Sequence, residues 1–324
     1  MPYHKFDRNM LQLKDLGERE HGLDLSIMMD PREMPVPFEN PKLYELVEKI
    51  KEANRRNASV ILMMGAHVIR SGCTPWLIRL MEEGVVTHFA LNGAGAIHDF
   101  EFALIGKTTE SVARYIQEGQ FGLWKQSGLI NDHVNRGAME GLGFGESLGK
   151  AISEQMLPFR KFSLLAAGYE KKVPVTVHVG IGMDIIHEHP NFDGALTGKA
   201  SYDDFLVFTK AVEKLQGGVF INAGSAVTGP EVYLKALAMA RNVAHGQGRA
   251  INAFTTGVFD ILDIDGDTAT PPDRSDPRYY FRPWKTILSR TVSDGGTGYY
   301  IRGEHKRTIS SLAYALLEEK GDRR

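Results

Sequence analysis

Residues 58–104 constrain the fold of this chain more than any other segment, because buried strands and helices alternate there. An apolar run over residues 60–64 stops at Gly65, and a helical pattern follows it. A second apolar run over residues 85–91 then meets a glycine turn at residues 92–96. Two strand–turn–helix units beside each other form the kind of crevice in which α/β proteins hold a nucleotide cofactor.

The same alternation continues to the end of the chain. Apolar runs predict further strands over residues 173–179, 217–224, 250–255 and 298–301. Helical patterns are found over residues 42–56, 155–169, 202–216, 230–241 and 308–319, and the glycine-rich stretch 128–152 is expected to be a long loop leading into a helix. We therefore expect an α/β protein with a Rossmann-like, mostly parallel sheet and helices on both faces. Residues 1–41, which are polar and rich in proline, are expected to form an arm or wrapping segment, and residues 42–324 a single α/β domain.

The composition is that of an ordinary globular protein, with 43% hydrophobic and 24% charged residues in 324. The net charge of −2 creates no field that would favour nucleic acid or an anionic membrane. The single cysteine, Cys73, excludes an intrachain disulfide and a multi-cysteine metal site, and it fits a reducing compartment. The first residues lack the apolar core of a signal peptide, and no apolar run approaches a membrane span, so we expect a cytoplasmic protein.

The glycine turn Gly93-Ala94-Gly95 permits two interpretations. Glycines after a strand let a diphosphate approach the backbone at the start of the following helix. The third glycine of a full dinucleotide fingerprint is missing, however, because His98 stands there. A tight turn without a ligand is the alternative. Further glycine clusters at residues 141–145 and 217–225 also favour a nucleotide-binding site, although glycine is common throughout the chain.

Two clusters of titratable residues invite a metal interpretation, and neither supports it. His187-Glu188-His189 lacks the i, i+4 spacing of a zinc helix, and a proline follows directly. Four aspartates between Asp260 and Asp267 do not have the glycine spacing of a helix–loop–helix calcium site. We therefore predict no metal site. The acidic stretch is either a solvated loop or a set of carboxylates that binds a polycationic substrate.

Lys285 follows Trp284 inside an aromatic and apolar run. Partial desolvation of a lysine favours the neutral amine, which is a nucleophile. The simpler alternative is a lysine whose ammonium group reaches water along its apolar stem.

The order of these segments resembles that of the deoxyhypusine synthase family over roughly residues 58–318. The resemblance rests on four stretches in register: VIRSGCTPWLIRLMEEGVVTHFALNGAGAIHDFEFAL, VPVTVHVGIGMDIIHEHPNFDG, GGVFINAGSAVTGPEVYLKALAMARN and the pair FDILDIDGD with PWKTI. It implies a Rossmann-like NAD-binding catalytic domain and a homotetramer built as a dimer of dimers. The implied activity is the NAD-dependent transfer of an aminobutyl group from spermidine to a protein lysine, through an imine on an enzyme lysine.

The resemblance also implies roles for individual residues. Lys285 would form the imine, with Glu231 or Thr228 standing where the family has a histidine that acts as a base. Polyamine would be bound by Asp184, Trp284, Asp260 and Asp263. NAD would be contacted by Ser71, Gly72, Asn92, Gly93, Ala94, Gly95, Asp99, Gly224 and Ser225.

Departures from the family pattern leave three alternatives open. Ile97 and His98 replace a pair of glutamates, and no glycine separates Trp284 from Lys285. The acceptor could then be a free diamine, as in homospermidine synthases. The chain could instead be an NAD-dependent amine oxidoreductase that keeps the reduced cofactor as a product, or an NAD-binding protein without catalytic activity.

Overall fold

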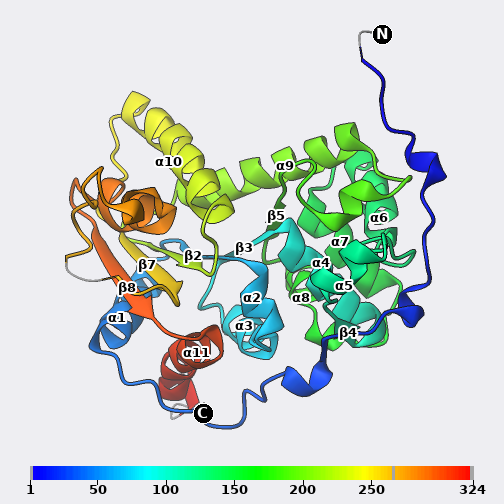
Figure 1. Ribbon diagram of the computed structural model, residues 1–324. Helices are drawn as coiled ribbons and strands as arrows, with labels where there is room; N and C mark the ends of the chain where they lie inside the picture. The colour runs from blue at the N-terminus through cyan, green and yellow to red at the C-terminus, as the bar shows by residue number, and fades with distance from the viewer. Residues whose placement is uncertain (1–2, 265–266, 322–324) are drawn as a thin grey trace.

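Six parallel strands form the central sheet of the computed structural model, which describes residues 3–264 and 267–321. The strands are β2 (Val60–Met64), β3 (His88–Asn92), β5 (Val175–His178), β6 (Val219–Ala223), β7 (Thr255–Asp260) and β8 (Thr297–Arg302). Their order across the sheet is β5-β3-β2-β6-β7-β8, and every neighbouring pair is parallel (Figure 1). Along the chain, β2, β3 and β5 are added toward one edge of the sheet, and β6, β7 and β8 are then added on the other side of β2 toward the opposite edge. This is the doubly wound order of a Rossmann fold. The predicted α/β fold class is confirmed.

Helices cover both faces of the sheet, so the strands are apolar on both sides. Every residue of β2 is buried. Ile61 and Met63 pack in the core under α9 (Gly194–Val212), α10 (Thr228–Gly246) and a π-helix (Pro283–Arg290). The alternate residues of β2 pack in the core under α1 (Pro41–Arg55), α3 (Thr74–Glu82) and α11 (His305–Gly321), on the opposite face (Figure 1).

A lobe of shorter helices lies beyond the β5 edge of the sheet (Figure 1). It is formed by α4 (Gly93–Ile105), α5 (Val112–Gln117), α6 (Leu129–Met139), α7 (Phe144–Glu154) and α8 (Leu164–Lys171). The short helix α2 (Ala66–Arg70) follows β2 and packs against α4. This lobe and the α10 side of the sheet therefore flank the carboxyl ends of the central strands.

Side chains of α9 close the outer edge of β5. The amide of Val177 donates to Oδ2 of Asp204 at 2.6 Å, and the amide of Val179 donates to Oγ of Ser201 at 3.1 Å. The same Asp204 oxygen accepts from the amide of Gly145 in the first turn of α7 at 2.8 Å. The edge groups that could pair with a strand of another chain are thus partly satisfied within this chain.

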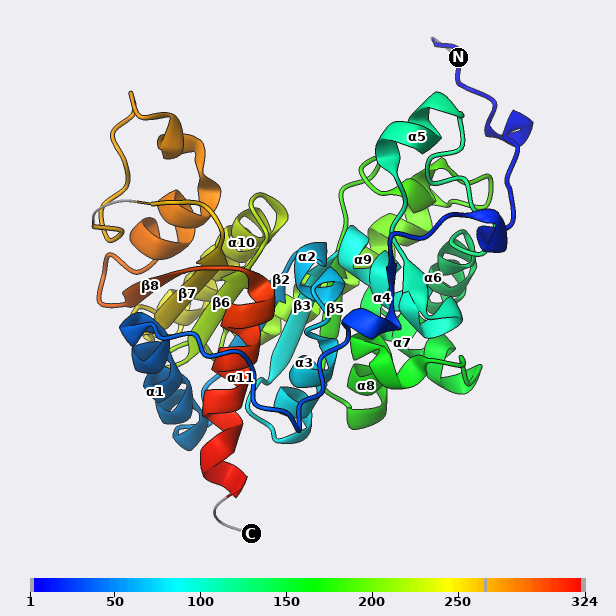
Figure 2. The same cartoon turned by 60° about the horizontal axis from the view of Figure 1, so that its bottom comes forward.

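The segment before α1 runs along the outside of the molecule (Figure 2). Its strand β1 (Leu23–Asp24) pairs antiparallel with β4 (Lys107–Thr108). Arg19 reaches inward to Glu101 on α4, where two hydrogen bonds of 3.0 and 2.6 Å join the guanidinium to the carboxylate. Both side chains are 1% exposed, so this ion pair fastens the segment to the helical lobe.

Three secondary-structure predictions are wrong. The strand expected at residues 250–255 begins only at Thr255, because Gln216 binds the amides of Asn252 and Ala253 in the loop before it. The expected long loop over 128–152 contains all of α6 and most of α7. Of the helix expected over 155–169, the structure has only a 3₁₀ turn at Arg160–Phe162 and the first part of α8. No helix of the described part of the chain is long and apolar enough to cross a membrane.

Candidate functional site

The turns after β2 and β6 touch at the point where the winding of the sheet reverses. A Cβ on Gly65 would come 2.1 Å from the carbonyl oxygen of Gly224, and Gly224 itself has a left-handed φ of 61°. Only glycine at both positions allows this approach. In doubly wound folds the ligand binds in the crevice outside the carboxyl ends of the strands at this reversal. We refer to this region as the switch-point crevice.

Asp184 fills the place where the sequence predicted a diphosphate. Helix α4 begins directly at Gly93, and the side chain of Asn92 accepts a hydrogen bond from the amide of Gly95 at 2.9 Å. A Cβ on Gly93 would lie only 2.1 Å from Oδ2 of Asp184, which comes from the loop after β5. Burial raises the pKa of Asp184 to about 6. The glycine turn, with half-buried Ala94, therefore accommodates a carboxylate of the chain itself.

Gly72 lies against the N-terminal segment, and Ser71 precedes it at the end of α2. The hydroxyl of Ser71 donates to the carbonyl of His67 at 2.7 Å, within the end of α2. The carbonyl of Gly72 accepts from the amide of Met29 at 3.1 Å, and Gly72 is buried. The predicted NAD contact at Gly72 does not fit this placement, because the segment covers it.

Asp99 does not fit its predicted NAD contact either. It is fully buried and accepts hydrogen bonds from the hydroxyl of Ser163 at 2.5 Å and the amide of Leu164 at 2.7 Å. It thereby holds the first turn of α8. Ser225 also stabilises the start of a helix, because its hydroxyl accepts a hydrogen bond from the amide of Gly229 at 2.8 Å in the turn that leads into α10.

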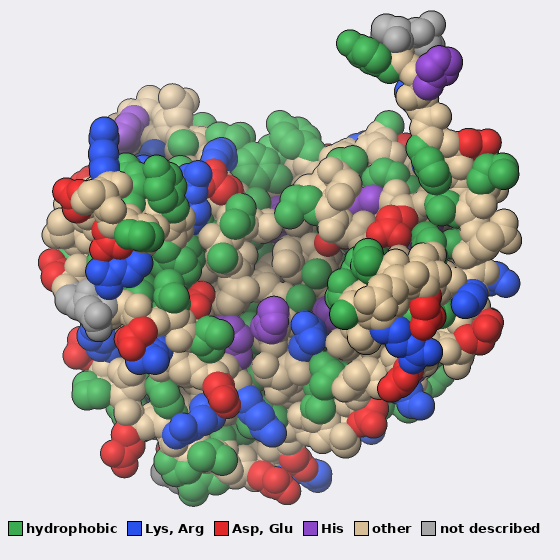
Figure 3. Space-filling model, in the orientation of Figure 1, with side chains coloured by type: hydrophobic (Ala, Val, Ile, Leu, Met, Phe, Trp, Pro, Cys, Tyr) green, Lys and Arg blue, Asp and Glu red, His purple; other side chains and the backbone are tan. Residues whose placement is uncertain are grey.

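His305 is a site residue that the sequence did not single out. It is the first residue of α11, and its Nε2 lies 2.5 Å from where a Cβ on Gly224 would be. Asp260, at the carboxyl end of β7, and His67, on α2, are close enough to shift its pKa. Histidine side chains gather near the middle of the face in Figure 3. No sequence signal pointed to His305, because it is far along the chain from the glycine turns.

The acidic loop after β7 is only partly available for a cation. Oδ1 of Asp260 accepts the amides of Ile261 and Leu262 at 2.8 and 3.1 Å. The carboxylate of Asp263 forms an ion pair with Arg302 at 2.7 Å, so its charge is already balanced. Asp265 lies outside the described residues.

The predicted catalytic lysine and its neighbour Trp284 both lie in the π-helix Pro283–Arg290. Lys285 lies in the first turn of the π-helix, half-buried, with its Nζ 3.5 Å from the ring centroid of Tyr279. Trp284 is 4% exposed and donates from Nε1 to the carbonyl of Thr270 at 3.0 Å, which makes it a core residue and not the wall of an open channel.

Glu231 is not a free base. Its carboxylate forms ion pairs with Lys235 and, at 2.9 Å, with Arg282. The hydrogen bond from Lys235 lowers the pKa of Glu231. A carboxylate held in this way is a weak proton acceptor, so the structure does not favour the predicted catalytic role.

Large apolar side chains border the carboxyl edge of the sheet. Ile181 and Met183, after β5, are 56% and 73% exposed. Val227, after β6, and Ile261, after β7, are 59% and 67% exposed. Apolar side chains that remain in water around a crevice are a common sign of a binding site.

The His187-Glu188-His189 sequence is used for loop structure. Nδ1 of His187 accepts the amides of Gly182 and Asp184 at 3.2 and 3.1 Å, and Nε2 of His189 bonds to the carbonyl of Gly122 at 2.9 Å. Among residues 3–264 and 267–321 no group of three or more histidine, cysteine, aspartate or glutamate side chains could hold a metal ion.

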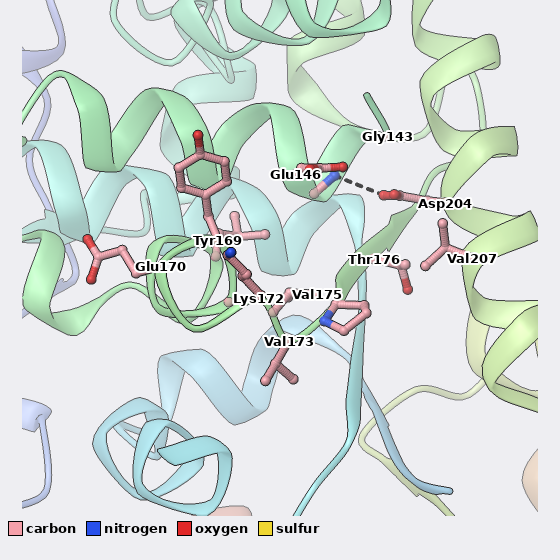
Figure 4. Close-up of a pocket in the computed structure, with 14 residues that line it drawn as sticks. Gly143, Glu146, Tyr169, Glu170, Lys172, Val173, Val175, Thr176, Asp204 and Val207 are labelled. Carbon is pink, nitrogen blue, oxygen red and sulfur yellow. Dashed lines mark hydrogen bonds between the residues drawn. The ribbon is translucent and has the colours of Figure 1, made fainter. Parts of the chain in front are cut away.

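A cavity of about 590 Å³ lies between α7, α8, α9 and the start of β5 (Figure 4). The hydrogen bond from the amide of Gly145 to Asp204 lies at its wall, and burial raises the pKa of Asp204 to about 7. None of the residues predicted to form the site lines this cavity. It lies at the amino end of β5, so we do not assign it to the cofactor.

No family model and no curated protein matches the chain. Among solved structures, the arginine dihydrolase ArgZ of the cyanobacterial ornithine–ammonia cycle aligns with a TM-score of 0.51 and 14% identity, over 87% of this chain and 33% of that one. A ternary complex of AgrE with ornithine and NAD+ aligns with a TM-score of 0.50 and 12% identity, over 89% and 35%. A conserved protein assigned to LOR/SDH from Methanococcus maripaludis S2 aligns with a TM-score of 0.51 and 16% identity, over 89% of this chain and 74% of that one.

This chain thus spans about a third of the length of ArgZ and AgrE. A structure assigned as a deoxyhypusine synthase from Entamoeba histolytica aligns with a TM-score of 0.39 and 6% identity, which is too low to support the predicted family. That resemblance stays a prediction. At these identities the comparisons show that the chain shares the doubly wound α/β fold of ArgZ, AgrE and the LOR/SDH protein.

Proposed function

We propose that the chain is an enzyme that uses NAD to oxidise a cationic amine in the switch-point crevice. The observation that carries the proposal is the position of Asp184. Its half-buried carboxylate lies against Gly93 at the carboxyl end of β3, and β3 is the neighbour of β2 in the sheet. An amine and a dinucleotide could therefore meet at one edge.

The residues of the crevice fit a dinucleotide. Gly65 and Gly224 bring the turns after β2 and β6 together at the reversal of winding, where doubly wound folds bind their ligands. Ile181, Met183 and Val227 offer apolar surface for flat rings. When bound, NAD would supply the acceptor for a hydride from the carbon next to the amine nitrogen. AgrE, which has the same fold, was solved with ornithine and NAD+.

Asp184 would bind the ammonium group of the substrate. With a pKa of about 6, its carboxyl group is mostly ionised at neutral pH. A hydrogen bond between an ammonium and a carboxylate is among the stronger polar contacts, especially away from water. Asp260 would add negative charge on the other side of the crevice.

Aminobutyl transfer from spermidine is the more specific candidate, and Lys285 would form the imine that this reaction requires. The lysine is half-buried in the first turn of a π-helix, an element that often marks functional sites. An imine on Lys285 could then pass to a protein lysine or a free diamine. A homotetramer and a cytoplasmic location remain part of this more specific proposal.

One experiment separates these functions. The protein is incubated with NAD+ and either ornithine or spermidine, NADH is followed by absorbance, and borohydride is added before peptide mass spectrometry. Accumulation of NADH supports amine oxidation, whereas an aminobutyl adduct on Lys285 with little NADH supports transfer. Calorimetry gives NAD+ affinity separately. Bound NAD+ without reaction of either amine would favour a catalytically silent protein, and absence of NAD+ binding would overturn the proposal.

A further inference from the structure

We propose that His305 accepts the proton of the substrate ammonium group in the switch-point crevice. The inference rests on the proposed function, because the amine substrate is what supplies the proton. His305 begins α11 directly after β8, and its Nε2 lies against the turn at Gly224. The imidazole therefore belongs to the same edge of the sheet as the glycine turns.

The ring of His305 differs from the other buried histidine rings in having no partner. Its Nδ1 is buried without a hydrogen bond, and no hydrogen bond joins either ring nitrogen to a described residue. Four other buried or largely buried histidines all have a partner: His88 and His178 share the hydroxyl of Thr176, His98 meets the hydroxyl of Thr108, and His189 meets the carbonyl of Gly122. Buried polar groups in folded proteins are nearly always hydrogen-bonded. A ring that stays unpaired at the crevice is thus suited to a ligand.

The surroundings of His305 keep its ring neutral. Burial lowers the pKa of His305, nearby His67 on α2 lowers it further, and Asp260 on β7 opposes both. The position at the start of α11 also disfavours a positive charge, because amide groups point outward there. The thiol of Cys73 contacts the backbone carbonyl of His305 at 3.6 Å and not the ring. A neutral imidazole has a lone pair that can accept a proton.

The chemistry of an amine requires such an acceptor. An alkylammonium group has no lone pair on nitrogen, so a carbon–nitrogen double bond cannot form from it. In the proposed step an N–H bond of the ammonium breaks and its electron pair stays on the nitrogen. The proton bonds to a ring nitrogen of His305, and Asp260 then stabilises the imidazolium. This is a proton transfer alone, so it consumes no oxidant or reductant.

The first test uses the intact protein and does not depend on turnover. Histidine-selective ¹⁵N spectra are recorded on the NAD+-loaded protein, with and without ornithine or spermidine, and His305 is assigned by comparison with His305→Gln. We expect the ring of His305 to be neutral without amine and its resonances to shift when amine is added. If calorimetry shows that the amine binds and the His305 resonances stay unchanged, the inference is overturned.

The second test compares His305→Gln with His245→Gln, a control in an exposed histidine of α10. Loss of a general base lowers kcat/KM by about 100- to 10,000-fold, and the acidic limb of its pH profile should vanish. The control should match the parent protein, and NAD+ affinity should change little in both. If His305→Gln oxidises the amine at the parent rate, His305 is not the acceptor and the proposed function stands. If no amine binds to the NAD+-loaded parent, the proposed function and the inference both fail.

Discussion

The carboxylate of Asp184 and the backbone of Gly93 are in direct contact, although the two residues come from different loops. Oδ2 of Asp184 lies 2.1 Å from where a Cβ on Gly93 would stand, at the first residue of α4. A dinucleotide phosphate cannot occupy this point while Asp184 stays there. The contact therefore keeps a phosphate away from the first residue of α4.

Asp184→Asn should weaken the binding of ornithine or spermidine without weakening that of NAD+. A hydrogen bond to a charged group contributes about 1.5–3 kcal/mol, so we expect a loss of about 10- to 100-fold in amine affinity. Isothermal titration calorimetry measures both ligands. Asp263→Asn is the matched control, because Arg302 already balances its charge. An equal loss of amine affinity in both variants would contradict the role of Asp184.

Glu101→Gln should destabilise the protein strongly. Arg19 and Glu101 are both buried, and Glu101 also accepts the hydroxyls of Thr108 and Ser127, each at 2.6 Å. Removing one partner leaves a buried guanidinium unbalanced, which costs about 3–5 kcal/mol. Urea unfolding gives the free energy.

The control for Glu101→Gln is Glu20→Gln. Glu20 lies on the same N-terminal segment as Arg19 and pairs with Arg114 of α5. The side chain of Glu20 is 80% exposed. Pairs of this kind contribute at most about 1 kcal/mol. Similar losses in the two variants would show that the buried pair is not what fastens the segment.

The stability of Asp204→Asn relative to the parent protein should increase as the pH rises. Burial raises the pKa of Asp204 from 3.8 to about 7 in the folded state. Between these values the folded parent binds more protons than the unfolded chain, so its stability falls as pH rises, by at most about 1.4 kcal/mol per pH unit. The variant lacks this dependence.

Unfolding free energies at pH 5 and pH 7 test this prediction. Asp203→Asn serves as the control, because Asp203 is a partly exposed residue paired with Lys199 at 2.6 Å. From pH 5 to pH 7 the unfolding free energy of Asp204→Asn should rise relative to that of the parent protein. The unfolding free energy of Asp203→Asn relative to the parent should stay the same. A difference that is the same at both pH values would mean that Asp204 has no raised pKa.

Cys73 should resist thiol reagents while the protein is folded. The side chain is fully buried, and burial raises its pKa to about 12. A thiol without solvent contact and without thiolate character reacts slowly. Mass spectrometry after treatment with iodoacetamide should show little alkylation at neutral pH and full alkylation in concentrated urea. Rapid alkylation of the folded protein would show that the start of α3 opens readily.

The apolar runs of the central strands were enough to predict them. Residues 60–64 are apolar throughout and residues 219–223 are apolar except for Asn222, as expected of strands buried on both faces. The glycine-rich stretch 128–152 was predicted to be a loop, but its glycines allow two helices to pack closely. A Cβ on Gly137 would come 1.9 Å from the hydroxyl of Ser147, so this glycine lets α6 and α7 approach each other.

The sequence by itself determined the alternation of strands and helices, and with it the α/β class, because burial on both faces leaves a pattern that is readable locally. It also marked Gly93, Asp184 and Asp260 as residues with chemistry. Only the tertiary structure decided how they are used. Strand order places Gly65 against Gly224, brings Asp184 onto Gly93 and leaves His305 unpaired beside them. Contacts between loops so far apart in the chain depend on how the strands are ordered, and no local pattern of residues encodes that order.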